Sequence, residues 1–229
     1  MSTAGLRVGL CGVGTVGLAT VHILRDQSAM LAARCGQTVS ITHVGARREV
    51  PHHDYAAARI SRDVMDVARD PDVDVLVELI GGTTVARDLI KLAIEQGKHV
   101  VTANKALIAE HGNELILLAE QAGVQLRFEA AVAGGIPVIK TLREAMAANA
   151  VSEVAGIING TGNFILTEMS TKGRSYVDVL AEAQALGYAE ADPTFDVDGT
   201  DAAHKLAILA SLAFGLPLAA EAPVQQGIP

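Results

Sequence analysis

Aromatic residues and cysteines are scarce in this chain. Of its 229 residues, 3% are aromatic and none is Trp, so a hydrophobic core must be built mainly from Ala, Val, Leu and Ile. The only cysteines are Cys11 and Cys35, and they form no CxxC pair. This spacing argues against a disulfide framework or a structural zinc site, and it favours a reducing compartment.

Long apolar runs and an excess of basic residues are also missing. No stretch reaches the ~18 uninterrupted apolar residues that a membrane span needs, and glycines interrupt the apolar N-terminus where a secretory signal would be continuous. Asp and Glu total 26 against 18 Lys and Arg, which gives a net charge of −8. Because acidic proteins bind nucleic acid and anionic membranes poorly, we expect a cytoplasmic protein that acts on small molecules.

Half of the residues are hydrophobic, and in the first half of the chain they form short β-type runs between helical patterns. The runs predict strands at Leu6–Cys11, Val39–Ala46, Val73–Ile80, Lys98–Thr102 and Val124–Phe128. The helical patterns cover Val16–Ala33, Val85–Gln96 and Asn113–Ala122. Nearly continuous apolar strands that alternate with helices are typical of a parallel sheet covered on both faces. We therefore predict an α/β domain of the Rossmann type over residues 1–133.

The pattern changes after about residue 133. Helices are predicted over Ile136–Ala148, Asn163–Thr171, Ser175–Leu186 and Asp201–Phe214, with one strand at Val154–Ile158. This mixture predicts a second domain of α+β type over residues 134–229. Its last segment, Pro217–Pro229, carries three prolines and no clear element, so we expect this domain to be incomplete at its C-terminal end.

A GxGxxG motif follows the first predicted strand and opens the first predicted helix. Its residues are Gly12, Val13, Gly14, Thr15, Val16 and Gly17. In a dinucleotide-binding loop the three glycines allow a tight turn, close approach of the pyrophosphate and close packing of helix on sheet. The helix N-terminus adds free N–H groups that attract phosphate. The alternative is a purely structural turn, but the strand–loop–helix context favours a dinucleotide.

The end of the second strand indicates which dinucleotide binds. An NAD site usually carries Asp or Glu there for the ribose 2′-hydroxyl, whereas this chain has Arg47 and Arg48 and no carboxylate until Glu49. Two guanidinium groups suit a 2′-phosphate, so NADP is favoured over NAD. Both arginines could instead be solvated loop residues.

Five further motifs resemble those of homoserine dehydrogenases and occur in that family's order. They are Glu78–Thr84 (ELIGGTT), Gly97–Leu107 (GKHVVTANKAL), Glu129–Pro137 (EAAVAGGIP), Ile158–Ile165 (INGTGNFI) and Leu186–Pro193 (LGYAEADP), the last continuing to Asp196, Gly199, Asp201 and Lys205. With the glycine loop they cover residues 6 to about 215. The resemblance implies interconversion of L-homoserine and L-aspartate 4-semialdehyde with NADP or NAD, in the biosynthesis of threonine, methionine and isoleucine.

The resemblance also implies roles for individual residues. Lys205 would give a proton to the carbonyl oxygen, Lys105 would lie between cofactor and substrate, and Asp201 would assist. The substrate would contact Glu190, Asp196, Gly160 and Thr161, and the cofactor would also contact Thr83 and Lys105. A monovalent cation such as sodium would be held by Glu129, Val132, Gly134 and Ile136, mostly through backbone carbonyls. The family further implies a homodimer formed through the second domain.

The residues support part of this assignment independently. Negative charge grows on the carbonyl oxygen during hydride transfer, so an acid or cation should lie there. Lys205 falls at the edge of the apolar stripe of its helix, with Asp201 one turn before it. The alternative for this pair is a surface ion pair. Lys105 follows a strand end, where open α/β sheets bind ligands; the alternative is an ordinary helix-start lysine.

The carboxylates between Glu190 and Asp201 suit a cationic amino acid. Calcium is disfavoured because the spacing is not that of an EF-hand loop, and some of the acids could cap the last helix, with Asp198 or Thr200 as N-cap. An acylating semialdehyde dehydrogenase is disfavoured as well, because it needs a nucleophilic cysteine and neither cysteine lies in the second half of the chain.

The family's catalytic region normally continues well beyond residue 229. We therefore expect this chain to be a fragment, a partial gene product or one piece of a split enzyme. Two hypotheses follow, namely a homoserine dehydrogenase or a catalytically incomplete dinucleotide-binding module that needs a partner chain.

Overall fold

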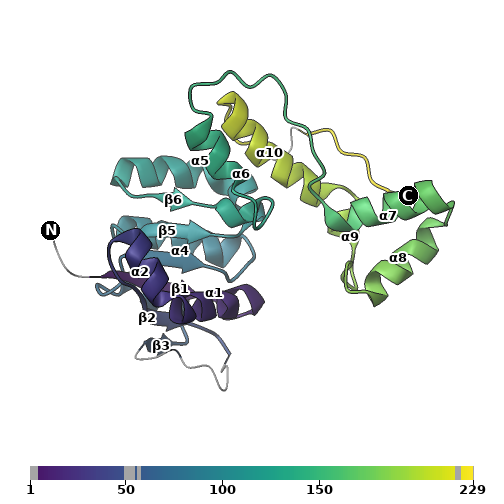
Figure 1. Cartoon of the computed structure of the whole chain (residues 1–229). Helices are drawn as coiled ribbons and strands as arrows, with labels where there is room; N and C mark the ends of the chain where they lie inside the picture. The colour runs from purple at the N-terminus through teal and green to yellow at the C-terminus, as the bar shows by residue number, and fades with distance from the viewer. Residues whose placement is uncertain (1–4, 49–54, 56–57, 220–222, 229) are drawn as a thin grey trace. The chain divides into compact units, whose positions relative to one another are not determined.

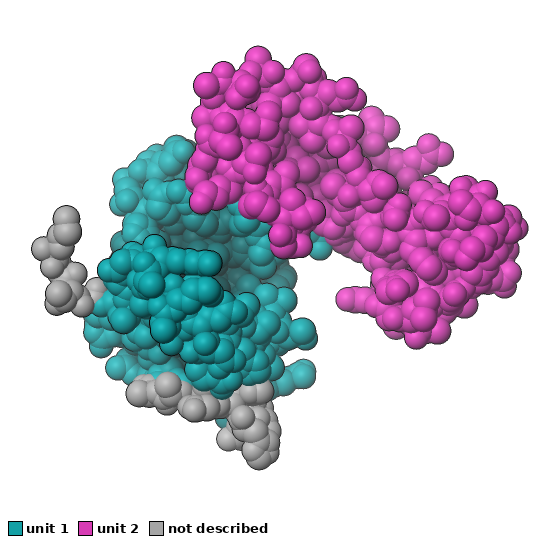
Figure 2. All heavy atoms as spheres, viewed as in Figure 1, with its two compact units in different colours: residues 1–131 teal, residues 132–229 magenta. Residues whose placement is uncertain are grey.

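The computed structural model describes residues 5–48, 55, 58–219 and 223–228. It divides the chain into two compact units, residues 1–131 (unit 1) and 132–229 (unit 2), which Figure 2 shows in different colours. No helix among the residues described is long and apolar enough to cross a membrane.

Unit 1 is built on a six-stranded sheet with the order β3-β2-β1-β4-β5-β6 (Figure 1). The strands are β1 (Leu6–Cys11), β2 (Val39–Gly45), β3 (Arg59–Ser61), β4 (Val75–Glu78), β5 (His99–Thr102) and β6 (Leu126–Arg127). Every neighbouring pair is parallel. The order reverses between β1 and β4, and in such open sheets ligands bind beyond the carboxyl ends of the strands at this switch point. The Rossmann-type α/β class predicted from the sequence is confirmed.

Helices cover both faces of this sheet. They are α1 (Thr15–Asp26), α2 (Ser28–Cys35), α3 (Val64–Arg69), α4 (Thr84–Glu95) and α5 (Lys105–Ala122), followed by the 3₁₀ turn η1 (Glu129–Ala131). Val21 of α1 packs with Leu10 and Val44 on one face. On the other face α3 approaches Gly9 and Gly45 so closely that an added Cβ would lie 2.5 Å and 3.0 Å from Val67. Side chains on a strand alternate between faces, so α1 and α3 cover opposite sides.

The regular elements that the structure describes in unit 2 are all helical. Its elements are α6 (Val138–Lys140), the π-helical turn η2 (Thr141–Ala145), α7 (Gly160–Lys172), α8 (Tyr176–Ala185), α9 (Thr194–Val197) and α10 (Thr200–Phe214). Helix α7 contacts α8 and α9, and α10 contacts α9 and η2. These contacts bury Ile165, Val179 and Ile208 completely.

The predicted strand Val154–Ile158 is wrong. Residues 151–159 contain no strand, although Asn159 has extended dihedral angles (φ −127°, ψ 117°). A strand requires a hydrogen-bonded neighbour, and the described part of unit 2 contains no other strand to supply one.

Two predicted helices are also interrupted. The segment Val16–Ala33 forms α1 and α2, separated at Gln27, where Asp26 and Ser28 favour helix poorly. The segment Ile136–Ala148 forms only the short α6 and η2. There the Thr141 hydroxyl donates to Pro137 O (2.7 Å), and Met146 N bonds Thr141 O, five residues back. Such side-chain competition and wide turns interrupt an α-helix.

Other elements were not anticipated or began elsewhere. β3, α3 and α9 were missed because they have six residues or fewer. Helix α5 begins at Lys105, eight residues before the predicted Asn113, because the Asn104 side chain accepts a hydrogen bond from Leu107 N and caps it. Its longer span also makes Lys105 the first residue of the helix.

Candidate functional site

The glycine loop of unit 1 joins β1 to α1. Gly12 has φ +99°, and a Cβ there would lie 2.4 Å from Leu79 O. A Cβ on Gly17 would lie 2.1 Å from Gly12 O, so this glycine allows the helix to pack on the loop. At Gly14 a Cβ would meet nothing within 4 Å. The loop therefore uses two glycines for its own fold and leaves open space at the third, as a pyrophosphate requires.

The remaining residues of the motif complete this loop. Val13 packs against the core of Leu10, Val21 and Val44. Thr15 opens α1 and is exposed, and Val16 follows it with 56% of its surface exposed. These backbone positions at the start of a twelve-residue helix supply the free N–H groups that favour an anion.

A buried carboxylate organises the neighbouring loops after β4 and β5. Glu78 is fully buried; its Oε1 accepts from Ile80 N (2.8 Å) and Gly81 N (3.2 Å), and its Oε2 accepts from the Thr102 hydroxyl (2.5 Å). Thr102 Oγ1 in turn accepts from Asn104 N (2.9 Å). One carboxylate thus holds both chain segments that lead to Thr83 and Lys105.

Asn104 closes the same network from the other side. Its Nδ2 donates to Gly82 O (2.7 Å), while its Oδ1 accepts from Leu107 N. Thr83 is the N-cap of α4 and Lys105 the first residue of α5, and both are half-buried. They therefore stand at the carboxyl ends of β4 and β5, on the sheet edge where the glycine loop also lies.

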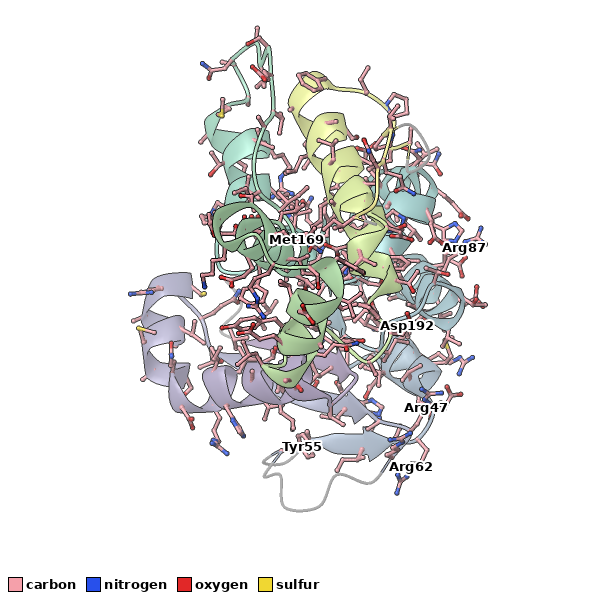
Figure 3. All side chains as sticks on the ribbon, turned by 90° about the vertical axis from the view of Figure 1, so that its right-hand side faces the viewer. Arg47, Tyr55, Arg62, Arg87, Met169 and Asp192 are labelled. Atoms are coloured by element: carbon pink, nitrogen blue, oxygen red, sulfur yellow. The ribbon has the colours of Figure 1, made fainter. Side chains whose placement is uncertain are left out.

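Arg47 and Arg48 are exposed directly after β2. A third arginine, Arg62, follows the neighbouring strand β3, and its Nη1 donates to Arg47 O (3.3 Å). Figure 3 shows Arg47 and Arg62 at the same edge of unit 1. Arg62 was not predicted, because β3 was not recognised and nothing in the local sequence links it to Arg47.

In unit 2, Lys205 and Asp201 form the predicted pair on α10. Lys205 Nζ donates to Asp201 Oδ2 (2.6 Å) and to Ile158 O (2.7 Å). The two side chains are only 18% and 6% exposed. Such burial is inconsistent with the alternative of a solvated surface ion pair.

Asn159 joins this pair to a second acid. Its Nδ2 donates to Asp201 Oδ2 (2.9 Å) and to Asp196 Oδ1 (2.8 Å), and its Oδ1 accepts from Gly162 N (2.6 Å) as the N-cap of α7. The arrangement places an ammonium group, two carboxylates and an amide side by side. It can donate a proton and can bind a cationic group.

The other predicted substrate residues lie around the start of α7 and the loop after α8. Gly160 is the first residue of α7, and the buried Thr161 donates to Tyr188 O (2.6 Å). Glu190 is exposed, and its carbonyl accepts from Gln184 Nε2 (3.1 Å). The N-cap of α10 is Gly199 rather than Asp198 or Thr200, because Asp198 Oδ1 accepts instead from Thr200 N (2.8 Å).

The predicted cation ligands span the end of unit 1 and the start of unit 2. Glu129 begins η1 and is half-buried, Val132 is fully buried, and Gly134 and Ile136 are exposed. Between them Ala133 has φ +50°, a left-handed conformation unusual for a residue other than glycine. Ile136 O already accepts from Val138 N (2.8 Å), and a carbonyl oxygen keeps a second lone pair for a cation.

Two family models match the chain in succession. Residues 12–129 match the NAD-binding domain of homoserine dehydrogenase, and residues 137–229 match the homoserine dehydrogenase model itself. The chain belongs to the homoserine dehydrogenase family. This agrees with the motifs recognised in the sequence.

Similar homoserine dehydrogenases are found among bacteria. The chain is 59% identical to that of Pseudomonas aeruginosa over 223 residues, which cover 97% of this chain and 51% of the relative. It is 45% identical to that of Bacillus subtilis, covering 97% of this chain and 52% of the relative. The chain thus spans about half the length of these relatives.

Solved homoserine dehydrogenases share the fold. The crystal structure of the Thiobacillus denitrificans enzyme has a TM-score of 0.93 at 50% identity, over 98% of this chain and 52% of that one. A hyperthermophilic archaeal homoserine dehydrogenase in complex with NADPH has a TM-score of 0.80 at 28% identity, over 93% of this chain and 71% of that one.

Proposed function

We propose that this chain carries the cofactor- and substrate-binding residues of an NADP-dependent homoserine dehydrogenase, which interconverts L-homoserine and L-aspartate 4-semialdehyde. The observation that carries this proposal is the hydrogen-bonded cluster of Lys205, Asp201, Asn159 and Asp196, in which Asp201 is buried and the other three side chains are partly buried. Unit 1 would supply the cofactor site and unit 2 the substrate site, as the two matched family models support.

Lys205 is the proton donor in this proposal. The bound dinucleotide would supply a hydride to the aldehyde carbon, and negative charge then grows on the aldehyde oxygen. The Lys205 ammonium stabilises that charge and passes its proton to the oxygen. Asp201 and Ile158 O hold Nζ at 2.6 Å and 2.7 Å, so the donor needs little reorganisation.

The carboxylates would hold the ammonium group of the amino acid. Asp196 shares Asn159 with Asp201, and Glu190 is exposed on the loop after α8. Gly160 and Thr161 would shape this site at the start of α7. Lys105, at the start of α5, would act between cofactor and substrate.

NADP is the proposed cofactor. Gly12, Gly14 and Gly17 with the start of α1 would cradle its pyrophosphate, and Thr83 would lie beside it. Arg47 and Arg48 would bind the 2′-phosphate, and the contact of Arg62 with Arg47 O adds a third cation at that edge. The NADPH complex of the archaeal relative supports this choice.

The remaining features are proposed from the family. A monovalent cation such as sodium would bind through Glu129, Val132, Gly134 and Ile136. The protein would act in the cytoplasm as a homodimer formed through unit 2, with a small-molecule substrate.

The test follows the near-ultraviolet absorbance of reduced nicotinamide with purified chain, homoserine and NADP⁺ or NAD⁺. We expect the unsubstituted chain to turn over homoserine, and we expect a Lys205→Ala substitution to abolish that turnover. If the folded chain binds NADPH but shows no turnover, the second candidate applies, namely an incomplete dinucleotide-binding module that needs a partner chain.

A further inference from the structure

A chain of hydrogen bonds links the buried side chains of Asp70 and His43 to the half-buried Ser61 in unit 1. His43 Nδ1 lies 2.6 Å from Asp70 Oδ2, and His43 Nε2 lies 2.8 Å from Ser61 Oγ. The His43 and Asp70 side chains are 2% and 3% exposed. The three residues come from β2, β3 and the turn that follows α3.

The geometry determines which atom donates each hydrogen bond when His43 is neutral. The Asp70 carboxylate only accepts, so His43 Nδ1 carries the hydrogen and Nε2 accepts from the Ser61 hydroxyl. Asp70 is itself held by Asp72 N (2.9 Å) and by Arg59 Nη1 (2.9 Å). The hydrogen bonds from Asp70 through His43 therefore hold the Ser61 hydroxyl in a fixed position.

Ser61 lies directly beside the arginines proposed to bind the 2′-phosphate. Its carbonyl accepts from Ala46 N (3.0 Å), the residue before Arg47. The next residue, Arg62, donates to Arg47 O. The position of Ser61 therefore affects both Arg47 and Arg62.

Strand β3 by itself constrains the position of Arg47 and Arg62 only weakly. β3 has three residues and pairs only with β2 at the edge of the sheet. Edge strands this short are held by few ladder bonds. A side-chain anchor buried beneath the strand supplies the additional constraint that a charged binding site needs.

We propose that the Asp70–His43–Ser61 chain positions Arg47 and Arg62 and thereby sets the preference for the phosphorylated dinucleotide. This rests on the proposed NADP site. His43 and Ser61 are positioning residues, since they act through the arginines. The orientation of the arginine side chains distinguishes NADPH from NADH, because a guanidinium binds phosphate well only when its planar group of N–H donors is correctly oriented.

The test measures dissociation constants for NADPH and NADH with the whole chain, using the fluorescence of the reduced nicotinamide. Ser61→Ala and His43→Phe are each expected to weaken NADPH binding about tenfold, with NADH binding changed less than about twofold. Ser61→Thr keeps the hydroxyl and should restore the preference. Thr42→Val is the matched control, since it removes a hydroxyl of β2, next to His43, that donates to Asp72 O (2.8 Å) and not to the Asp70–His43–Ser61 chain.

Each other outcome overturns the proposal. Suppose that the unsubstituted protein prefers NADPH and that Ser61→Ala leaves the ratio of the NADPH and NADH dissociation constants unchanged. The hydrogen bonds of Asp70, His43 and Ser61 are then only structural. If both dinucleotides weaken equally, the effect is a general loss of the fold, and circular dichroism melting would show it. If the unsubstituted chain has no preference for NADPH, the NADP assignment itself fails, which is a distinct result.

Discussion

Lys205 carries its charge where water is largely excluded. Its ammonium lies 2.6 Å from a carboxylate that is 6% exposed, and an Asn159 amide contacts the same oxygen. Removing one member of a buried ion pair leaves the other charge unpaired. The stability of the pair and its proposed chemistry therefore depend on the same atoms.

Replacing Lys205 by Met is expected to destabilise the chain by roughly 2 kcal/mol, less than for a fully buried pair because Asn159 still donates to Asp201. Urea unfolding measures this change. Lys172→Met is the matched control, since Lys172 makes the same i,i+4 contact with Glu168 (2.8 Å) but is 62% exposed. Equal losses in both variants would contradict a special role for the buried pair.

The two cysteines offer a second contrast at this scale. Burial, and then the charge of Glu78, raises the pKa of the Cys11 thiol, and Cys11 is fully buried while Cys35 is exposed. Because only a thiolate reacts quickly, a maleimide at neutral pH should modify Cys35 alone in the native chain and both thiols in urea. Mass spectrometry of the digested chain reads this out. Native modification of Cys11 would show that β1 opens readily.

At the scale of elements, functional side chains double as helix caps. Asn159 caps α7 and Asn104 caps α5. Each uses its amide oxygen for the cap and its amide nitrogen for another segment, namely the acids of unit 2 or Gly82 O. The beginning of each helix therefore determines where the nearby lysine or carboxylate lies.

Asn159→Ala should lower the free energy of unfolding by about 1 kcal/mol, the usual value of an N-cap. It should also abolish homoserine binding. Ser175→Ala removes a comparable cap on α8, where Ser175 Oγ accepts from Asp178 N (3.2 Å). That variant should lose similar stability but keep homoserine binding, measured by calorimetry. Unchanged binding in Asn159→Ala would separate the cap from the site.

The glycine loop gives a further test at this scale. Gly14→Ala adds a methyl group into open space at φ −72°, so the chain should fold with an unchanged melting temperature. The methyl group would, however, occupy the room needed by the pyrophosphate, and NADPH affinity should fall at least about tenfold. Gly156→Ala also meets open space and should leave NADPH binding unaltered. Full binding by Gly14→Ala would argue against a phosphate at this glycine.

For the whole molecule, the proposed cofactor and substrate residues belong to different compact units. A ligand that binds only the native state stabilises it, by about 2.7 kcal/mol at a hundredfold excess over Kd. Because the stabilised segments exchange their amide hydrogens more slowly, hydrogen exchange can show which unit each ligand binds.

Hydrogen exchange is expected to show NADPH protecting the amides of residues 12–17 and 80–83. Homoserine added with the oxidised cofactor should extend protection to residues 159–162 and 196–205. Mass spectrometry with peptides from both units measures this. Protection of the second set by homoserine alone, without cofactor, would revise the order of binding; no protection of the first set would contradict the cofactor site.

The local sequence pattern determined much of the secondary structure and several of the motifs of this protein. The alternation of apolar runs and helical patterns predicted the parallel sheet, GxGxxG predicted the loop before α1, and the spacing of Asp201 and Lys205 predicted their contact. Each of these features depends on residues close in the chain, whose periods of two and 3.6 are set by backbone geometry.

Only the tertiary structure decided the contacts between distant segments. The bonds of Glu78 to Thr102, of Asn159 to Asp196 and Asp201, and of His43 to Asp70 and Ser61 join residues at least 18 positions apart. Conversely, residues 154–158 have the pattern of a strand but no partner strand in the described part of unit 2. A residue's pattern sets its local conformation, whereas pairing and hydrogen bonding depend on which other segment the fold brings beside it.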